Sequence, residues 1–281
     1  MKLRAAIFLT AGFLAALAAS CQQPVRTLAK EDLERQRIIN EVRIRGGSVQ
    51  FADNLPDQPI VGVSFAKVKA KDEDVALVKG LPELRSLNLY NGEVTDAGLE
   101  LIQGLTKLQE LDITQCSISD AGLVHLKGLT DLRVLSELGP RVTNAGLANL
   151  KNLKELRELR LQGARVTNAG LAELRDLAKL ERLMLASTEI TDDGLAVVGG
   201  LTNLKNLNLY NTQVGDAGVK HLKGLLKLED LSLFRTQVSD AGLDYIKQMP
   251  WLQQIDLSDT KTTRKGQIDL QKALPRLGIR R

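Results

Sequence analysis

The sequence predicts an α/β solenoid, in which short parallel strands line a concave face and helices cover the convex face. Two observations predict this fold class. From Leu81 to Gln248 the chain realigns with itself every 24 residues without a gap, which gives seven regular units. Apolar residues recur at positions 1, 4, 7, 9, 14, 19 and 22 of these units. One unit cannot bury its apolar residues alone, whereas stacked units share a continuous core.

Each unit is expected to contain one strand followed by one helix. Apolar positions 7 and 9 alternate with polar positions 6 and 8, which indicates a short strand with one buried face. Position 15 is usually Thr or Ser and position 16 is usually Asp or Asn, a pair that caps helix starts and complements the helix dipole. Leucines at positions 19 and 22 share a helical face. Gly at position 24 is expected to end several helices, and Gly at position 18 to allow a close backbone approach.

The third unit breaks the pattern of apolar positions. Its position 9 is Glu137, and Leu138 comes one residue late. Because a buried glutamate is costly, we expect a bulge or a shifted strand end that leaves Glu137 near solvent.

The repeat resembles a known family. In the second unit the pattern L-x-x-L-x-L-x-x-N/C-x-L is matched by Leu108, Leu111, Ile113, Cys116 and Ile118. The chain thus resembles leucine-rich-repeat proteins, in a 24-residue LxxLxLxxTxVTDAGLxxL variant similar to the cysteine-containing subclass of F-box adaptors. It is also similar to repeats of bacterial surface proteins and leucine-rich-repeat lipoproteins. The resemblance covers residues 57–272 and implies a right-handed horseshoe that recognises proteins.

The two ends of the repeat region are expected to be capped. Residues 31–56 are assigned to an N-terminal capping helix and strand, whose helix carries apolar Leu33, Ile38, Ile39, Val42 and Ile44. Degenerate units occupy 57–80 and 249–272. Residues 273–281 are assigned to a C-terminal cap or tail.

The N-terminus has the pattern of an export signal. Residues 1–20 contain basic Lys2 and Arg4, then an apolar run that is short for a membrane span, then small residues before Cys21. This resembles a bacterial lipoprotein signal, although Ala18 stands where a larger aliphatic residue is typical. The resemblance implies that Cys21 is lipidated, with residues 21–30 as a tether. Gln22, rather than Asp, favours the outer membrane of the cell envelope. Cleavage as a plain signal peptide stays open.

Motifs for catalysis, cofactors or metals do not appear in the sequence, which predicts a protein that is not an enzyme and has no cofactor. His125 and His221 lie four units apart, or about 20 Å, which is too far to share a metal ion. Cys116 is interpreted as a small inward residue that satisfies loop backbone groups. The net charge of +4 offers no argument for nucleic acid as a partner.

The exposed positions of the concave face carry the candidate binding residues. Three aromatic residues occupy position 10 in a chain with only 3% aromatics. Aromatic and arginine side chains are enriched at binding hot spots, although the rings could instead fold over the sheet edge and only cover the core. The candidate partner-binding residues are Tyr90, Arg182, Met184, Asn206, Asn208, Tyr210, Asn211, Asp230, Phe234 and Arg235.

The sequence therefore predicts a non-catalytic protein–protein interaction scaffold, anchored at the bacterial cell envelope, that binds another protein on its concave face. Two alternatives stay open. One is a carbohydrate or peptidoglycan binder with Tyr210 and Phe234 as stacking platforms. The other is a substrate adaptor resembling F-box leucine-rich-repeat proteins, against which the export signal and the lack of an F-box before the repeats argue.

Overall fold

The computed structural model describes residues 30–54 and 58–281. The chain divides into two compact units, Met1–Ile38 and Ile39–Arg281. Of the first unit the structure describes the beginning of helix α2 (Lys30–Ile44), where Arg37 pairs with Glu34 at 2.7 Å. The predicted signal segment, Cys21 and residues 21–29 of the tether lie outside the described residues.

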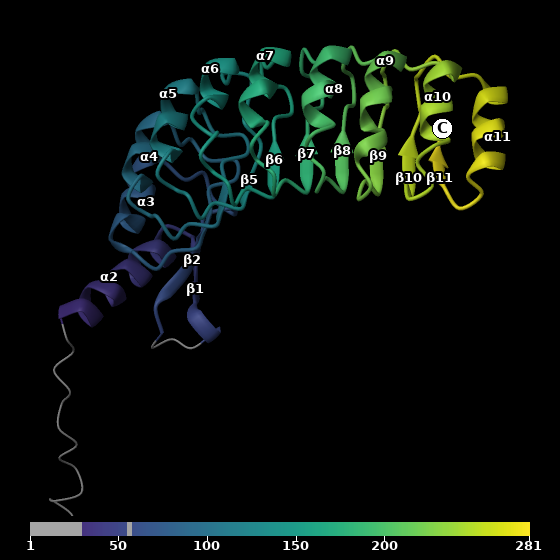
Figure 1. Cartoon of the computed structure of the whole chain (residues 1–281). Helices are drawn as coiled ribbons and strands as arrows, with labels where there is room; N and C mark the ends of the chain where they lie inside the picture. Colours follow the sequence, from purple (N-terminus) through teal and green to yellow (C-terminus); the bar gives the residue numbers. More distant parts are fainter. Residues whose placement is uncertain (1–29, 55–57) are drawn as a thin grey trace, which may run out of the picture. The chain divides into compact units, whose positions relative to one another are not determined.

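The second unit is built on one sheet of eleven strands that follow one another in chain order (Figure 1). Strands β1 and β2 are antiparallel, and every later pair is parallel. The strands are β1 (Ser48–Phe51), β2 (Ile60–Ser64), β3 (Ser86–Asn88), β4 (Glu110–Asp112), β5 (Val134–Leu135), β6 (Glu158–Arg160), β7 (Arg182–Met184), β8 (Asn206–Asn208), β9 (Asp230–Ser232), β10 (Gln254–Asp256) and β11 (Gly278–Arg280). Parallel partners are 24 residues apart, as in Leu183↔Leu207, so equal positions of successive units are neighbours.

Short helices form the second layer, on the outer side of the curve that Figure 1 shows for this unit. They are α3 (Asp72–Val75), α4 (Asp96–Ile102), α5 (Asp120–Leu123), α6 (Asn144–Leu147), α7 (Asn168–Leu171), α8 (Asp192–Val198), α9 (Asp216–Val219), α10 (Asp240–Ile246) and α11 (Arg264–Ala273). Four are extended by 3₁₀ turns, namely η2 (Ala76–Gly80), η3 (Val124–Leu126), η4 (Ala172–Leu174) and η5 (Lys220–Gly224), and a further 3₁₀ turn, η1 (Ala52–Asn54), follows β1. The predicted α/β solenoid is confirmed.

The apolar positions of the repeat form the core between the sheet and the helices. In the second unit Leu108, Leu111, Ile118, Leu123 and Leu126 are at most 3% exposed. Burying a leucine side chain contributes about 2 kcal/mol, and each unit repeats the same set. Stacking thus provides the stability that a single unit lacks.

The third unit departs from the regular strand as expected. Strand β5 ends at Leu135, and Glu137 is only partly buried. Leu138 takes the buried place of position 9, because its side chain is fully buried and its N–H donates to the Arg160 carbonyl. Leu89, a regular position 9, makes the equivalent bond to the Asp112 carbonyl. The prediction of a shifted strand end is confirmed.

The helix starts are capped by the hydroxyl residues at position 15. The side chains of Thr95, Ser119, Thr143, Thr167 and Ser239 accept a hydrogen bond from the backbone N–H two residues later. This satisfies one of the unpaired N–H groups of the first helical turn. Thr191 and Gly215 begin their helices without such a bond.

The Asp or Asn at position 16 has a further role that joins consecutive units. One carboxylate oxygen of Asp96 accepts the Ser119 backbone N–H at 2.8 Å, and the other accepts the Ser119 hydroxyl at 2.5 Å. We call this series the Asp/Asn ladder. Its rungs are Asp72–Thr95, Asp96–Ser119, Asp120–Thr143, Asn144–Thr167, Asn168–Thr191, Asp192–Gly215, Asp216–Ser239 and Asp240–Thr263.

The ladder explains the glycine at position 18. The prediction that this glycine allows a close approach of another backbone segment was wrong. A Cβ added at Gly98 would lie 2.5 Å from Oδ1 of Asp72, and one at Gly122 would collide with Oδ1 of Asp96. The approaching atom is a side-chain oxygen of the preceding unit. Glycine is required because that oxygen occupies the space of a side chain.

Both ends of the repeat region differ in part from the sequence expectation. Leu33 and Ile44 of α2 are 56% and 79% exposed, so only Ile38, Ile39 and Val42 behave as a buried face. Residues 278–280 form strand β11 against β10, within the segment 273–281 that the sequence assigned only to a cap or tail. The backbone of this short segment continues the sheet.

Candidate binding site on the concave face

A groove of about 440 Å³ lies on the concave face over strands β7 to β11. Its floor includes the apolar Leu207, Leu231 and Ile255, and its polar lining comes from positions 6 and 8 of neighbouring strands. Because each of these positions sits in a paired strand, the backbone that carries the lining is held rigidly. The groove is an open surface on which a chain segment can lie.

Four of the predicted binding residues meet in this groove, namely Met184, Asn206, Asn208 and Asp230. The Asn206 amide donates to a carboxylate oxygen of Asp230 at 2.5 Å. The Asn208 side-chain oxygen accepts the Tyr210 backbone N–H at 2.9 Å. This Asx turn recurs at Asn88, Asp112 and Asp256. The side-chain oxygen of Asn208 therefore shapes the turn, while the residue also lines the groove.

Sequence reasoning missed four further lining residues, Ser232, Gln254, Asp256 and Arg280. Arg280 comes from β11, and its guanidinium lies 3.6 Å from the Asp256 carboxylate. It was missed because residues 273–281 were assigned to a cap or tail. The alternation of Leu277 and Ile279 with polar neighbours was the available signal for a strand.

Tyr210 and Phe234 lie outside the groove lining and stack on one another. Their ring centroids are 4.8 Å apart with an angle of 15° between the ring planes. Both rings are partly buried, and the Arg235 guanidinium lies 5.7 Å from the centre of the Phe234 ring. Each ring thus covers one face of the other. This arrangement favours the interpretation that the rings cover the sheet edge.

Asn211 and Arg235 occupy a turn that ends each strand. Their φ angles are 53° and 55°, and position 11 of most other units is also left-handed. In this conformation the Asn211 N–H donates to the Phe234 carbonyl of the next unit, and the Arg235 N–H donates to the Ser258 carbonyl. The left-handed backbone costs about 1 kcal/mol or more for a residue with a Cβ. These two residues therefore have a structural role that the sequence reasoning did not see.

Arg182 lies beside the groove and is held in an ion-pair cluster. It pairs with Glu158 at 2.9 Å, and Arg160 pairs with the other oxygen of Glu158. Burial raises the pKa of Glu158, but hydrogen bonds from Arg182 and Arg160 outweigh it, so the pKa lies below its usual value. Tyr90 is 40% exposed and belongs to the unit of β3, five units from Tyr210. At about 4.8 Å per strand this separation is about 24 Å.

The remaining reactive side chains have structural partners. The Cys116 thiol donates to the Leu89 carbonyl at 3.2 Å, and burial raises its pKa to about 11. Because the thiolate is the reactive form, this cysteine is a poor nucleophile. The ring nitrogen Nδ1 of His125 lies 3.4 Å from the side-chain oxygen of Gln103. Within residues 30–54 and 58–281, no three His, Cys, Asp or Glu side chains gather to hold a metal ion.

Comparison with known proteins agrees with this architecture. Residues 104–126 match a family model described as a leucine-rich repeat. An internalin of Listeria monocytogenes has a similar structure, with a TM-score of 0.55 and 22% identity over 74% of this chain and 70% of that one. The chain has the fold of a leucine-rich-repeat solenoid.

Two more solved structures share the fold of this leucine-rich-repeat solenoid. A leucine-rich-repeat protein of Leptospira interrogans has a TM-score of 0.55 and 20% identity over 75% of this chain and 57% of that one. The ectodomain of a plant receptor kinase from Arabidopsis thaliana has a TM-score of 0.52 and 18% identity, over 83% of this chain and 31% of that one. No curated protein matches the sequence. In the part of the chain that the structure describes, every helix is too short or too polar to cross a bilayer.

Proposed function

We propose that this leucine-rich-repeat solenoid is a non-catalytic scaffold that binds another protein on its concave face. The observation that carries the proposal is the groove over β7 to β11, where Met184, Asn206, Asn208 and Asp230 come together. A surface whose side chains stand on rigid strands loses little conformational entropy when a partner binds. The groove is therefore a preorganised contact site.

The lining suggests the chemistry of the bound segment. Asp230 and Asp256 face a single cation, Arg280, so the groove carries a net negative charge. Met184 adds a flexible apolar contact of the kind that is common at binding surfaces. An extended segment with a basic side chain suits this lining, because the base can pair with Asp230 while the backbone bonds to the amide groups.

The fold itself supports a protein partner. The Arabidopsis ectodomain, which shares only the fold with this chain, was solved in complex with Casparian strip integrity factor 2. This fold is thus able to hold a partner. The stacking of Tyr210 on Phe234 leaves less ring surface for the carbohydrate alternative, because each ring already covers one face of the other.

We also propose that the protein is held at the bacterial cell envelope through acylation of Cys21. The sequence pattern of residues 1–21 supports this, as does Gln22 for the outer membrane. Metabolic labelling with a radioactive fatty acid should label the wild-type chain, and Cys21→Ser should abolish both the label and the membrane retention that survives a high-salt wash. Retention of the unlabelled Cys21→Ser protein in the salt-washed membrane fraction would contradict this anchor.

The concave-face proposal is tested by site-specific photocrosslinking in cells. A photoreactive amino acid at Met184 should capture one discrete protein, whereas the same amino acid at Asn88 should not. Asn88 is a matched control because it occupies the same position 8, on β3 and outside the groove. The capture at Met184 should be lost when Asp230→Arg reverses the charge of the lining.

Equal capture at Asn88 and Met184, or capture that survives Asp230→Arg, would overturn the concave groove as the binding site. Thermal unfolding of the Asp230→Arg protein separates a lost contact from a lost fold. An unchanged melting temperature with lost capture supports the proposal.

A further inference from the structure

The two edges of the solenoid have opposite charge. The helix-end edge consists of the last turn of each helix and its connection to the next strand. It comprises residues 79–85, 103–109, 127–133, 151–157, 175–181, 199–205, 223–229, 247–253 and 271–277. The helix-start edge consists of the connections from each strand to the next helix. It comprises residues 67–73, 91–97, 115–121, 139–145, 163–169, 187–193, 211–217, 235–241 and 259–265.

The helix-end edge holds 16 Lys and Arg against 6 Asp and Glu, a net charge of +10. The helix-start edge has the same number of residues but holds 9 Lys and Arg against 11 Asp and Glu, a net charge of −2. The overall charge of +4 conceals this difference. A surface that concentrates positive charge raises the local concentration of anionic partners.

Helix dipoles account for only part of the positive charge. Seven of the 16 cations lie at the first or second residue of these segments, in or just after the last turn of a helix or 3₁₀ turn, where the helix C-terminus favours them. The other nine lie beyond the last turn, where that effect has decayed. They are Arg85, Lys107, Arg133, Lys154, Arg157, Lys179, Lys205, Lys227 and Arg276. These nine have no role in completing a helix.

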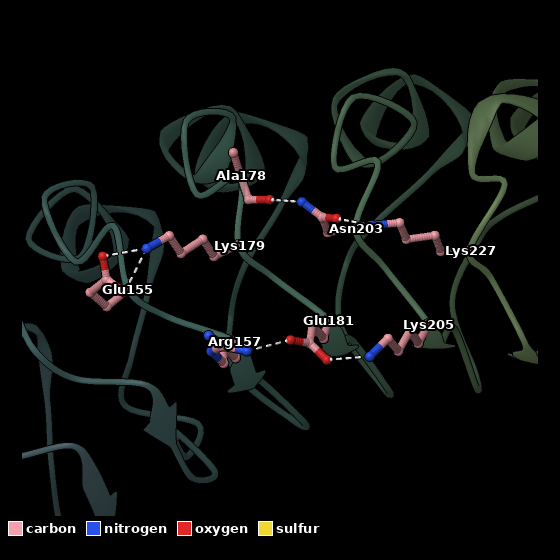
Figure 2. A network of polar contacts seen from close by, with 8 residues as sticks. All are labelled: Glu155, Arg157, Ala178, Lys179, Glu181, Asn203, Lys205 and Lys227. Atoms are coloured by element: carbon pink, nitrogen blue, oxygen red, sulfur yellow. Dashed lines mark hydrogen bonds and ion pairs between the residues drawn. The ribbon is translucent and has the colours of Figure 1, made fainter.

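Ion pairs neutralise the helix-end edge incompletely. In Figure 2 the Glu181 carboxylate lies between Arg157, at 2.9 Å, and Lys205, at 2.7 Å, so one acid serves two cations. Lys227 bonds the amide oxygen of Asn203, a neutral partner, at 2.6 Å. Lys179, Lys205 and Lys227 line a shallow hollow of about 250 Å³ in which cations outnumber carboxylates.

An exposed leucine lies among these cations. Leu226 is 65% exposed and directly precedes Lys227. Apolar side chains beside Lys and Arg are typical of proteins that bind the surface of an anionic bilayer, because the apolar group enters the interface while the cations meet the phosphates. Trp251 is the single aromatic residue of the helix-end edge, so the row of stacking platforms that single-stranded nucleic acid requires is missing from it.

We propose that the helix-end edge docks on a membrane surface rich in anionic phospholipid. Its cations come from nine successive segments, and at about 4.8 Å per strand they extend over about 40 Å. They form a row along one edge instead of converging on one pocket, which suits a plane of phosphate groups. Each Lys or Arg near such a surface increases partitioning about fivefold. Docking on this edge leaves the concave groove free, so the inference goes beyond the proposed function.

The test measures flotation of the full chain with vesicles of phosphatidylcholine, with and without phosphatidylglycerol. The chain carries Cys21→Ser so that no acyl chain is attached, and binding to neutral vesicles measures what other apolar residues contribute. We expect stronger binding to the anionic vesicles that declines as potassium chloride increases. The triple variant Lys179→Gln, Lys205→Gln, Lys227→Gln should reduce the binding to anionic vesicles by about tenfold or more.

The matched control is Lys67→Gln, Lys261→Gln, Lys265→Gln, which removes the same charge from exposed lysines of the helix-start edge. It should bind like the parent chain. An equal loss in both triple variants, or equal binding to neutral and anionic vesicles, would overturn the proposal. So would stronger capture by DNA or polyglutamate than by anionic vesicles, because the partner would then be an acidic macromolecule. Photocrosslinking at Met184 should be unaffected by the vesicle-binding variant, so the two proposals fail separately.

Discussion

The two edges of the solenoid both repeat one pairing every 24 residues, but the pairings differ in kind. On the helix-start edge, Asp or Asn oxygens bond backbone N–H groups of the next unit and fill the space left by a glycine. On the helix-end edge, exposed Lys and Arg side chains pair with exposed carboxylates, and Glu181 and Lys205 remain 27% and 45% exposed. The hydrogen bonds of the helix-start edge are fixed by packing, whereas the Lys and Arg side chains of the helix-end edge could release their carboxylates and bind a partner. The comparison separates a structural edge from an edge available for binding.

The largest loss of stability should come from replacing a position-18 glycine, because the added Cβ would collide with a carboxylate of the Asp/Asn ladder. Gly122→Ala places a Cβ against Oδ1 of Asp96, which disrupts the hydrogen bond that the Ser119 N–H donates to that oxygen. Overpacking and loss of this part-buried hydrogen bond together should lower the free energy of unfolding by about 3 kcal/mol. Urea unfolding followed by circular dichroism measures it.

Gly104→Ala is the control for that substitution, because a Cβ at Gly104 meets no atom within 4 Å. Its free energy of unfolding should change by less than about 0.5 kcal/mol. Equal losses of stability in the two alanine variants would show that glycine is needed for backbone conformation alone. The Asp/Asn oxygen would then not be the reason for glycine at position 18.

An intermediate effect should follow from removing one ladder carboxylate. Asp216→Ala removes bonds to both the backbone N–H and the hydroxyl of Ser239, and should cost about 2 kcal/mol. Asp192→Ala removes only the hydrogen bond that the Gly215 N–H donates. Its loss in free energy of unfolding should be about 1 kcal/mol smaller than that of Asp216→Ala. Thermal unfolding of the two proteins side by side checks the order. If Asp192→Ala lowers the free energy of unfolding more than Asp216→Ala does, the hydrogen bond from the Ser239 hydroxyl makes no measurable contribution to stability.

The smallest effect should come from the helix-end edge. Hydrogen bonding from Lys205 lowers the pKa of Glu181, but both side chains are partly exposed to solvent, which screens the pair. Glu181→Gln should therefore lower the free energy of unfolding by about 0.5 kcal/mol or less at neutral pH. Since the folded pKa is depressed, this contribution is present above the unfolded value of about 4.5 and disappears as pH falls through the folded value.

Unfolding of the wild type and Glu181→Gln, measured from neutral to acidic pH, provides the check. The difference between the two proteins should also shrink with added salt. If Glu181→Gln lowers the free energy of unfolding as much as Asp216→Ala does, the comparison fails. The ion pairs of the helix-end edge would then stabilise the fold as strongly as the Asp/Asn ladder.

Most of the fold could be predicted because the repeat shows its periodicity directly. The burial of Leu108 and Leu123, the capping role of Ser119 and the shifted strand at Glu137 follow from spacing and from the cost of burying polar groups. The strand β11 was harder to predict, because its only signal is the alternation around Leu277 and Ile279 and the rest of the repeat pattern is missing there. Its place depends on pairing with β10 across space.

The candidate site was harder to foresee because local sequence does not say which exposed positions converge. Met184, Asn206, Asn208 and Asp230 come together because register sets equal positions side by side. Tyr210 and Phe234 do not line the groove with these four residues, because their rings stack on one another instead. Asn211 and Arg235 were expected to contact a partner, but their left-handed φ angles also tie them to a turn.

The sequence by itself determined the repeat, its core and the capping of its helices, because these depend on which residue types recur at a fixed spacing. Only the tertiary structure decided that Asp96 reaches Ser119 and fills the space beside Gly122. It also decided that the groove extends to Arg280 and that the cations gather on one edge. The physical reason is that a solenoid sets residues 24 positions apart side by side, so interactions between units exist only once the units stack.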